Sequence, residues 1–598
     1  MSIPLRTHQC GLVGTQHIDT TITINGWVNR RRDHGGVIFI DARDRSGLVQ
    51  LVFNPDHCDE TTMALAHKLR AEFVIAVTGK VIARAPEMVN EKLATGAIEI
   101  VAEQLEILNS AKPLPFQLDE ADNVDEELRL KHRYLDLRRE KMHNFLKLRH
   151  QVVYAMREAL NDDGFYEIET PLLSKSTPEG ARDFLVPSRL QPGKFYALPQ
   201  SPQIYKQLLM ASGMEKYFQI ARCFRDEDLR ANRQLEFSQV DIEMSFVNED
   251  MVHDMTERMM AHLFKKVFDV ELSLPFDRCS FKEVFDKYGN DKPDRRFEMP
   301  IQTVTSLFAS SELKFLKAVA NDGGSIGALC VKEYDFSRSE LENLVSKTIK
   351  DFGAKGLLYI RFKEDGSSDS PVSKFLPADF FAQAQALIPG LTTNDTLLLV
   401  AGAYKEAWTT LGRLRLHLGH KLNLIDTSKQ DLLWVTDFPL FEWDDETKRY
   451  YAVHHPFTQP TQGWHEQEPA DMTARAYDLI YNGEELGGGS IRIHESAMQE
   501  KVFELLGINE QEAKDKFGFL LEAQELGCPP MGGIALGLDR LIMLLTGAPS
   551  IREVIAFPKT QSGVSPLMQS PCGVDAAQLK EVYVQTKLPA SLRLQEEE

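Results

Sequence analysis

The sequence lacks any long apolar run. No stretch approaches the ~20 consecutive apolar residues that a membrane-spanning helix needs, and residues 1–10 lack the basic start and apolar stretch of an export signal. These two absences predict a cytoplasmic protein that does not contact a membrane.

Paired cysteines are also lacking. No C-x-x-C spacing occurs, so the sequence offers neither the usual zinc-binding pattern nor a redox dithiol. We expect reduced, mostly structural thiols. The seven cysteines are scattered along the chain at Cys10, Cys58, Cys223, Cys279, Cys330, Cys528 and Cys572.

The sequence also lacks an excess of basic residues, and the formal net charge of its 598 residues is −20. A protein that coats nucleic acid non-specifically needs a basic surface, so that class is disfavoured. RNA could still bind at local basic patches, which lie at residues 30–32 and 129–141. The contents of 43% hydrophobic and 26% charged residues are those of a globular protein, and the length predicts roughly three to five domains.

Residues 20–108 have the alternating pattern of short strands. Three strands, a helix and two further strands form the order of an OB-fold barrel, a common reader of single-stranded RNA. The expected strands are 21–28, 37–41, 48–53, 74–83 and 98–108, with a helix over 59–73. Residues 113–125 are acidic and contain prolines, which suits a hinge.

Beyond the hinge, apolar spacing predicts a helix over 145–160, followed by a strand over 165–173 that carries Pro171. Strands are also expected over 217–224 and 239–244, with a charged loop between them. A helix over 249–268 contains four methionines, which we interpret as core residues.

Two short segments carry the strongest chemical signal. The first, Phe224 to Glu227, places Arg225 beside two carboxylates at the start of the charged loop. The second, Gly537 to Arg540, follows a glycine-rich strand that admits a close ligand and precedes an apolar helix. An arginine can bind phosphate with its planar fork, so the pair predicts a nucleotide site.

These segments resemble motifs 2 and 3 of the class II aminoacyl-tRNA synthetases, and the helix–strand–proline unit resembles motif 1, at the dimer interface of that family. The insertion that opens at Asp291 resembles the extra domain of the bacterial aspartyl-tRNA synthetases. The resemblance implies an α+β multidomain fold with an antiparallel catalytic sheet, and a homodimer. It divides the chain into an anticodon-binding barrel (1–112), a hinge (113–140), a catalytic domain in two parts (141–290 and 423–560), the inserted domain (291–422) and a C-terminal extension (561–598).

Activation of a carboxylic acid by ATP requires attack on the α-phosphate, so the protein must position and neutralise anions. Arg225 suits the α-phosphate. Arg540 can stack on adenine and reach the γ-phosphate, and we expect Lys206 to complete the catalytic cations. The remaining ATP-binding residues implied by the resemblance are Asp226, Glu227, Gln234, Phe237, Glu485, Gly537, Leu538 and Asp539.

Asp478 and Glu485 lie seven residues apart and precede three consecutive glycines. Few carboxylate ligands combined with substrate phosphates are what Mg²⁺ prefers. A pair of solvated helix carboxylates is the alternative for this spacing alone. The position of the pair ahead of motif 3 favours the metal, and we expect Mg²⁺ as the cofactor.

A second pair, Lys206 and Arg492, would hold a side-chain carboxylate and reject an amide, because an amide leaves buried charge unpaired. This looks like the aspartate pocket of the family. The resemblance adds further aspartate-binding residues to this pair: Glu179, Ser201, Gln203, Arg225, Asp241 and His454.

In the barrel, four residues match the family's anticodon-reading positions: Arg32, Phe39, Gln50 and Glu99. Phe39 would stack on an unstacked base, although a core position is the alternative. His34 stands where strictly aspartate-specific relatives tend to have leucine, and Glu87 where some have lysine. Both resemble the relaxed type that also charges asparagine tRNA.

The sequence therefore predicts an aspartate–tRNA ligase that uses ATP, L-aspartate, tRNA(Asp) and also tRNA(Asn); strict specificity for tRNA(Asp) is the alternative. A lysine enzyme is disfavoured by the two cations, and a non-catalytic RNA-binding paralogue by the presence of both arginines. The segment His417 to His420 mimics the H-x-G-H signature of class I synthetases. It lacks the early Rossmann context and the second signature loop, so we interpret it as the end of a helix.

Overall fold

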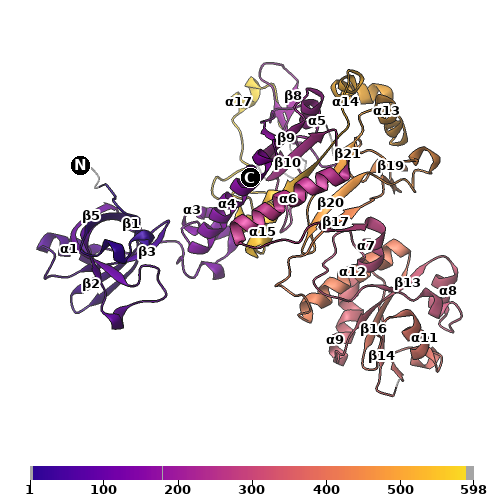
Figure 1. Cartoon of the computed structure of the whole chain (residues 1–598), viewed down its shortest axis with the longest axis horizontal. Coiled ribbons are helices and arrows are strands. Elements are labelled where there is room, and N and C mark those ends of the chain that lie inside the picture. Colours follow the sequence, from indigo (N-terminus) through magenta and orange to yellow (C-terminus); the bar gives the residue numbers. More distant parts are fainter. Residues whose placement is uncertain (1–4, 178–179, 366, 588–598) are drawn as a thin grey trace, which may run out of the picture. The chain divides into compact units, whose positions relative to one another are not determined.

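The computed structural model describes residues 5–177, 180–365 and 367–587. It divides into two compact units, each considered by itself (Figure 1). Unit 1 comprises residues 1–147, 555–560 and 564–571, and unit 2 comprises residues 148–554, 561–563 and 572–598. Within the described ranges, no helix combines the length and the apolar character needed to cross a membrane.

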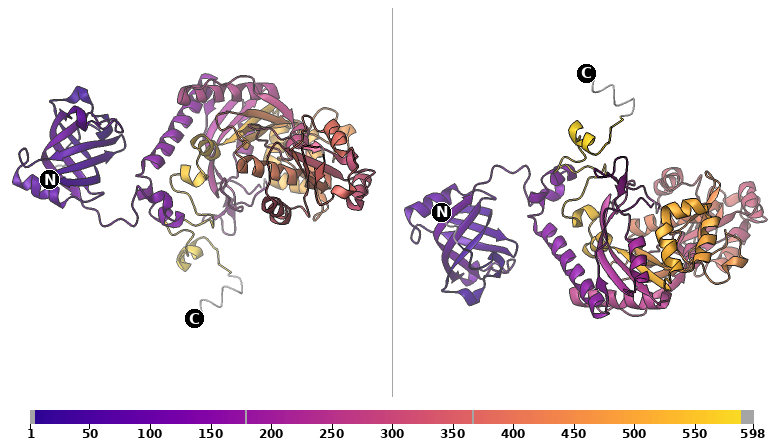
Figure 2. Two further views of the ribbon diagram at one scale, coloured as in Figure 1. Left: turned by 90° about the horizontal axis from the view of Figure 1, so that it is seen from below. Right: turned by 90° about the horizontal axis from the view of Figure 1, so that it is seen from above.

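Unit 1 begins with a closed barrel of strand order β1-β2-β3-β5-β4, seen from two further sides in Figure 2. Alternate side chains, such as Ile22 and Ile24, fill its interior, and Asp59 caps the single helix by accepting from the Thr62 amide at 2.6 Å. The predicted OB fold is confirmed. The elements are β1 (Thr21–His34), β2 (Val37–Asp44), β3 (Gly47–Phe53), α1 (Glu60–Lys68), β4 (Val74–Ala83) and β5 (Ile98–Asn109).

The predicted hinge contains two short helices, α2 (Glu126–Lys131) and α3 (Arg133–Asp136). Just after them, Arg138 donates to Glu72 of the barrel at 2.7 Å and lies 5.4 Å from the ring centroid of Trp27. Arg43 binds the same carboxylate at 2.8 Å. The end of the hinge is therefore fastened to the barrel within unit 1.

Unit 2 is built on an eight-stranded sheet of order β11-β17-β20-β21-β22-β10-β9-β6. The pairs β11–β17 and β6–β9 are parallel, and the central strands pair antiparallel. Their bounds are β6 (Tyr166–Glu167), β9 (Lys216–Phe224), β10 (Glu236–Ser245), β11 (Asp277–Ser280), β17 (Leu432–Thr436), β20 (Ala476–Tyr481), β21 (Glu484–Arg492) and β22 (Met531–Gly537). The α+β class predicted for the chain is thereby confirmed.

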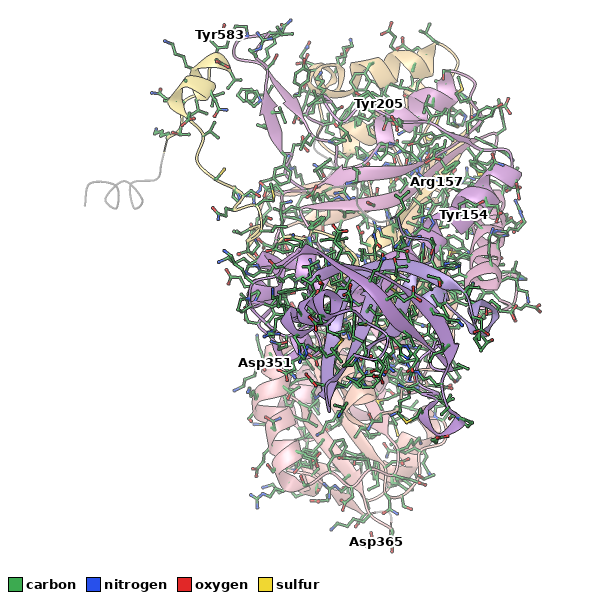
Figure 3. The ribbon with its side chains drawn as sticks, turned by 90° about the vertical axis from the view of Figure 1, so that its left-hand side faces the viewer. Tyr154, Arg157, Tyr205, Asp351, Asp365 and Tyr583 are labelled. Atoms are coloured by element: carbon green, nitrogen blue, oxygen red, sulfur yellow. The ribbon has the colours of Figure 1, made fainter. Side chains whose placement is uncertain are left out.

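Helices cover this sheet. Three of the four methionines of α6 are buried as predicted, but the prediction is wrong for Met251, which is 48% exposed. His253 of α6 stacks on Trp434 with ring centroids 4.2 Å apart. Tyr154 and Arg157, both labelled in Figure 3, project from α4, where Arg157 forms a bidentate pair with Glu167 of β6. The helices are α4 (Glu140–Asp162), α5 (Gln203–Ala211), α6 (Glu249–Phe268), α7 (Phe281–Tyr288), α13 (Ser496–Leu505), α14 (Glu510–Glu525), α15 (Leu538–Thr546) and α16 (Ile551–Val554).

The strand expected over 165–173 is wrong in its extent. Only Tyr166–Glu167 pairs, with β9, because the chain then leaves the sheet edge ahead of Pro171, which has no amide to donate. The preceding helix is longer than predicted, running from Glu140 to Asp162. The apolar helix expected after Arg540 likewise starts earlier, at Leu538.

The insertion forms its own five-stranded antiparallel sheet, of order β12-β13-β16-β14-β15. Apolar cores lie on both of its faces. Arg415 of α12 is buried and donates to the carbonyl oxygens of Asp294 and Phe297 at 3.0 and 2.8 Å, so it ties the entry of the insertion to its exit. The elements are β12 (Gln302–Thr303), α8 (Lys314–Asn321), β13 (Ser325–Val331), α9 (Arg338–Asn343), α10 (Ile349–Asp351), β14 (Leu358–Phe362), β15 (Ser368–Asp369), α11 (Phe380–Leu387), β16 (Thr396–Gly402) and α12 (Tyr404–Lys421).

Candidate active site

A cavity of about 1030 Å³ lies over the central strands of unit 2. Segments far apart in sequence meet there, since β10 pairs with both β9 and β22. The predicted residues that line it are Ser201, Gln203, Lys206, Arg225, Glu227, Gln234, Phe237, Asp241, His454, Asp478, Glu485, Arg492, Gly537, Asp539 and Arg540.

Two of the predicted residues that the structure describes, Asp226 and Leu538, do not line the cavity. Asp226 faces Arg182 at 3.6 Å, and Leu538 is buried in the core, so neither side chain reaches the cavity. Glu179, predicted to bind aspartate, lies outside the described residues.

The β9–β10 hairpin presents Arg225. Its amide donates to the Leu235 carbonyl at 2.8 Å, which closes the charged loop. The guanidinium lies 5.0 Å from the ring centroid of Phe237. Arg225 therefore covers one face of Phe237, which the resemblance places among the ATP-binding residues, so a base could stack on that face only if Arg225 turned away.

Arg540 emerges where β22 passes into α15. Its guanidinium hydrogen-bonds the Glu485 carbonyl oxygen and lies 3.6 Å from the Glu485 carboxylate. Asp539, which we expected to bind ATP, instead uses both carboxylate oxygens within the protein. It accepts from the Ser238 amide at 2.8 Å and from Arg149, which identifies it as an anchor for the strand-to-helix turn.

Four buried charges form the floor of the cavity. Lys206, on the first turn of α5, donates to Asp241 at 2.7 Å and lies 3.2 Å from Glu243. Arg492 forms a fork with Glu243 at 2.9 and 3.0 Å. None of these side chains is more than 3% exposed. The two cations are therefore held in place by two carboxylates on one strand.

Glu243 was not predicted from the sequence. The available signal was its spacing from Asp241, because residues two apart on β10 point to the same face of the sheet. Two acidic residues in an otherwise apolar strand demand partners. Their partners are the two cations that the sequence did single out.

Several polar atoms are buried here without a hydrogen bond inside the described part of the chain: Asp241 Oδ2, Gln203 Nε2 and His454 Nε2. Buried polar atoms are ordinarily paired, so these three are suited to a polar ligand. An acceptor on Asp241 fits an ammonium group. The donor on Gln203 fits an oxygen.

The charges of the floor are set by burial and by their neighbours. Burial raises the pKa of Asp241, and the Lys206 ammonium offsets this only in part. Burial also tends to raise the pKa of Glu243. The positive charges of Arg492 and Lys206 outweigh this effect and hold the pKa of that carboxyl below its usual range. Burial lowers the pKa of His454 to about 4, so this imidazole is neutral at pH 7.

Asp478 and Glu485 lie on the neighbouring strands β20 and β21, which excludes the alternative of a solvated pair on a helix. Asp478 is 8% exposed, and its Oδ1 lies 2.2 Å from where a Cβ on Gly488 would be, so only glycine fits opposite it. Burial raises the pKa of Asp478 well above its usual range, reinforced by Glu485 and Asp291 and opposed by Arg540.

The carboxylates of Asp478 and Glu485 suit a hard cation that takes its remaining ligands from the substrate and from water. Among the described residues, no group of three or more His, Cys, Asp or Glu side chains could hold a metal ion alone. Two carboxylates combined with substrate phosphates and water match the preference of Mg²⁺. A divalent cation would also relieve the repulsion that Asp478 meets from Glu485.

In unit 1, the predicted anticodon residues lie along one outer face of the barrel. Arg32 donates to Asp41 at 2.6 Å and to Gln50 at 3.1 Å, and Gln50 donates to Glu99 at 2.8 Å. Arg84 lies 3.7 Å from Glu99. Asp41 and Arg84 were not predicted, and the sequence carried no motif that would have marked them.

Phe39 lies between the buried Ile38 and Ile40 of β2 and therefore points outward. It is half-buried and contacts His34, with ring centroids 5.9 Å apart. The alternative of a core phenylalanine is wrong. His34 ends β1 beside the tight turn of Gly35 and Gly36, whose φ angles of +61° and +90° are accessible to glycine; Glu87 is exposed between β4 and β5.

Comparison with known proteins agrees with this geometry. A family model described as tRNA synthetases class II (D, K and N) matches residues 125–561, and one described as OB-fold nucleic acid binding domain matches residues 22–108. The chain therefore belongs to the class II tRNA synthetases of the D, K and N group.

Individual relatives cover nearly the whole chain. It is 50% identical to the aspartate–tRNA(Asp/Asn) ligase of Caldanaerobacter subterraneus, over 98% of each chain. It is 51% identical to the aspartate–tRNA ligase of Bacillus licheniformis, over 97% of this chain and 99% of that protein. The solved asparaginyl-tRNA synthetase of Pyrococcus horikoshii with asparaginyl-adenylate shares the fold, with a TM-score of 0.60 at 18% identity, over 93% of this chain and 99% of that chain.

Proposed function

We propose that this chain is an aspartate–tRNA ligase. The observation that carries the proposal is the pair of buried cations, Lys206 and Arg492, fixed by Asp241 and Glu243 beneath a cavity that also holds Arg225 and Arg540. An aspartate side chain would complete this floor. Asparagine would present a neutral amide, whose NH2 group cannot accept a hydrogen bond from either cation, so the pocket should select against it.

Aspartate would bind with its ammonium on Asp241 Oδ2 and its side-chain carboxylate between Lys206 and Arg492. Its α-carboxylate would then attack the α-phosphate of ATP to form aspartyl-adenylate and release pyrophosphate. Arg225 would stabilise the charge that develops on the α-phosphate, and Arg540 would hold the nucleotide. The terminal ribose hydroxyl of tRNA would finally accept the aspartyl group.

Asp478 and Glu485 would hold Mg²⁺, which supplies positive charge to the ATP phosphates. Asp478 itself is only 8% exposed and lines the cavity beside Glu485, which suits a ligand of such an ion. Neutral His454 would line the aspartate pocket without adding charge.

A homodimer is part of the proposal. Large apolar side chains are exposed around α4, β6 and the end of β10, and the helix–strand unit of α4 and β6 is where the family places its interface. They are Tyr154 (57% exposed), Tyr166 (63%), Leu172 (43%), Leu173 (51%) and Phe246 (64%). Exposed patches of this kind often mark protein interfaces. Sedimentation at micromolar concentration would report the assembly state.

The test of the activity is exchange of labelled pyrophosphate into ATP without tRNA. Aspartate should support exchange, whereas asparagine and lysine should support little. Because this assay involves only the first step, it isolates the cavity of unit 2 from the barrel. Equal exchange with lysine would overturn the assignment of the pocket.

Phe39→Ala should raise the KM for tRNA by about tenfold, because base stacking contributes about 1–3 kcal/mol. Pyrophosphate exchange should stay at the wild-type rate, since Phe39 belongs to the barrel of unit 1. Aminoacylation at varied tRNA concentration measures the first quantity. A parallel loss of both activities and of thermal stability would contradict the role in RNA binding.

Relaxed tRNA choice is the second part of the proposal, so the enzyme should aspartylate both tRNA(Asp) and tRNA(Asn). Exposed His34 can donate or accept a hydrogen bond, whereas leucine offers only shape. His34→Leu should shift the ratio of kcat/KM toward tRNA(Asp) by a few-fold to about tenfold. Negligible wild-type charging of tRNA(Asn) would favour the strictly specific alternative.

A further inference from the structure

The cavity of unit 2 extends beyond the residues assigned to ATP and aspartate. Its outer part, here called the outer chamber, is lined by six aromatic side chains: Phe281, Phe285, Tyr404, Phe441, Trp443 and Tyr450. Lys405 and Glu442 stand at its rim and form an ion pair. None of these eight residues has a role in the proposed activation of aspartate.

Two separate elements form the walls of the outer chamber. One wall combines α7 with the start of α12, where Phe285 and Tyr404 have ring centroids 5.6 Å apart. The other is the two-stranded hairpin β18 (Phe441–Asp444) and β19 (Arg449–Ala452). Trp443 pairs directly with Tyr450 across this hairpin, so both rings share one face, with centroids 5.1 Å apart.

The first wall is fixed in position. A Cβ on Gly289, at the end of α7, would lie 2.0 Å from the Trp408 carbonyl oxygen of α12. A Cβ on Gly412 would lie 2.6 Å from the Tyr288 carbonyl oxygen. The Trp408 indole also donates to the Asp286 carbonyl at 2.8 Å. The inserted domain is therefore packed closely against α7 (Figure 1), so these two elements form one continuous wall of the chamber.

Two rings of the outer chamber, those of Trp443 and Tyr404, are available to a ligand, whereas Phe441 is buried. Trp443 is 47% exposed and Tyr404 is 39% exposed, although both line a concave surface. Exposed aromatic faces beside a cation are the usual platform for unpaired nucleotides, whose bases stack and whose phosphates seek positive charge. A backbone phosphate at the rim would compete with Glu442 for Lys405.

We infer that the outer chamber binds the unpaired 3′-terminal nucleotides of the tRNA, with bases stacked on Trp443 and Tyr404. The inference rests on the proposed function. In its second step, an RNA end must pass from solvent to the adenylate, and the outer chamber is continuous with the cavity in which that adenylate forms. The inserted domain thus supplies part of the surface that guides this end.

Trp443→Ala and Tyr404→Ala test the inference, with two measurements on the full-length chain. Transfer of aspartate to tRNA should fall about tenfold in kcat/KM, through a raised KM for tRNA. Aspartate-dependent pyrophosphate exchange should keep its wild-type rate. Trp443→Phe should restore most of the transfer, because it restores an aromatic face.

Phe315→Ala is the matched control, since Phe315 is a 60% exposed aromatic residue of the same inserted domain that does not line the cavity. It should leave both rates unchanged. A direct probe is an RNA hairpin with an unpaired 3′ tail, which should quench tryptophan fluorescence in the wild type more than in Trp443→Phe. The same hairpin without its tail should give no such difference.

The outcomes separate the two proposals. Wild-type exchange that fails with aspartate would reject the proposed function itself. Normal wild-type exchange with unchanged transfer in both alanine variants would reject the outer chamber as an RNA site. A proportional fall of exchange and transfer, with a wild-type melting temperature, would assign the chamber to ATP or aspartate and overturn the inference.

Discussion

Glu243→Gln should reduce aspartate-dependent pyrophosphate exchange by about 10²- to 10³-fold. The substitution keeps the shape of the side chain but leaves Lys206 and Arg492 with only Asp241 as a buried counter-charge. Breaking a buried pair destabilises a protein by about 3–5 kcal/mol. The fork that aims Arg492 is lost as well, so the KM for aspartate should rise more than kcat falls.

The control for this prediction lies on the same strand. Glu236 pairs with Arg222 at 3.0 Å on the exposed side of the hairpin, so Glu236→Gln should change neither exchange nor stability appreciably. Exchange kinetics at varied aspartate, together with thermal melts, make the comparison. An unchanged KM for aspartate in Glu243→Gln would show that Arg492 needs no carboxylate to hold its position.

Arg540→Ala should reduce the same exchange by roughly 10²-fold or more, the scale of losing one preorganised charge at a transition state. Folding should survive, because the guanidinium points into the cavity and binds only Glu485 among the described residues. Arg540→Lys should recover part of the rate, since it keeps the charge without the planar fork. The measurement is exchange at saturating aspartate and varied ATP.

Arg222→Ala serves as the control for Arg540→Ala, because Arg222 is a 43% exposed arginine on β9 that does not line the cavity. Its exchange rate should equal that of the wild type. If Arg540→Ala also exchanged at the wild-type rate, the segment from Gly537 to Arg540 would have no part in nucleotide binding.

Much of the fold could be predicted because its signals are local. The alternation of the barrel strands and the apolar spacing of α6 depend only on neighbouring residues, so both were recovered, although β1 runs to His34, well beyond its predicted end at residue 28. The edge strand after α4 was overestimated for the opposite reason. Whether Phe165 to Leu173 pairs depends on what lies beside it, and only Tyr166–Glu167 meets β9.

The residues of the candidate site also differ in how far the sequence predicts them. Charged residues in distinctive motifs, such as Arg225 and Arg540, could be found because their types and order are unusual. Glu243 was missed although its spacing from Asp241 was a signal, because its partners Lys206 and Arg492 come from distant segments. Asp539 lines the cavity, and its carboxylate also anchors the strand-to-helix turn, which the motif alone did not indicate.

The hydrogen bonds of Arg415 bear on how the chain can be engineered. One side chain near the exit of the insertion binds carbonyl oxygens from Asp294 to Met299 at its entry, so the two crossing points are neighbours in space. A domain whose ends meet can be excised or exchanged with little cost in loop closure. The catalytic sheet could therefore accept a short peptide, or a foreign domain with adjacent termini, in place of the insertion.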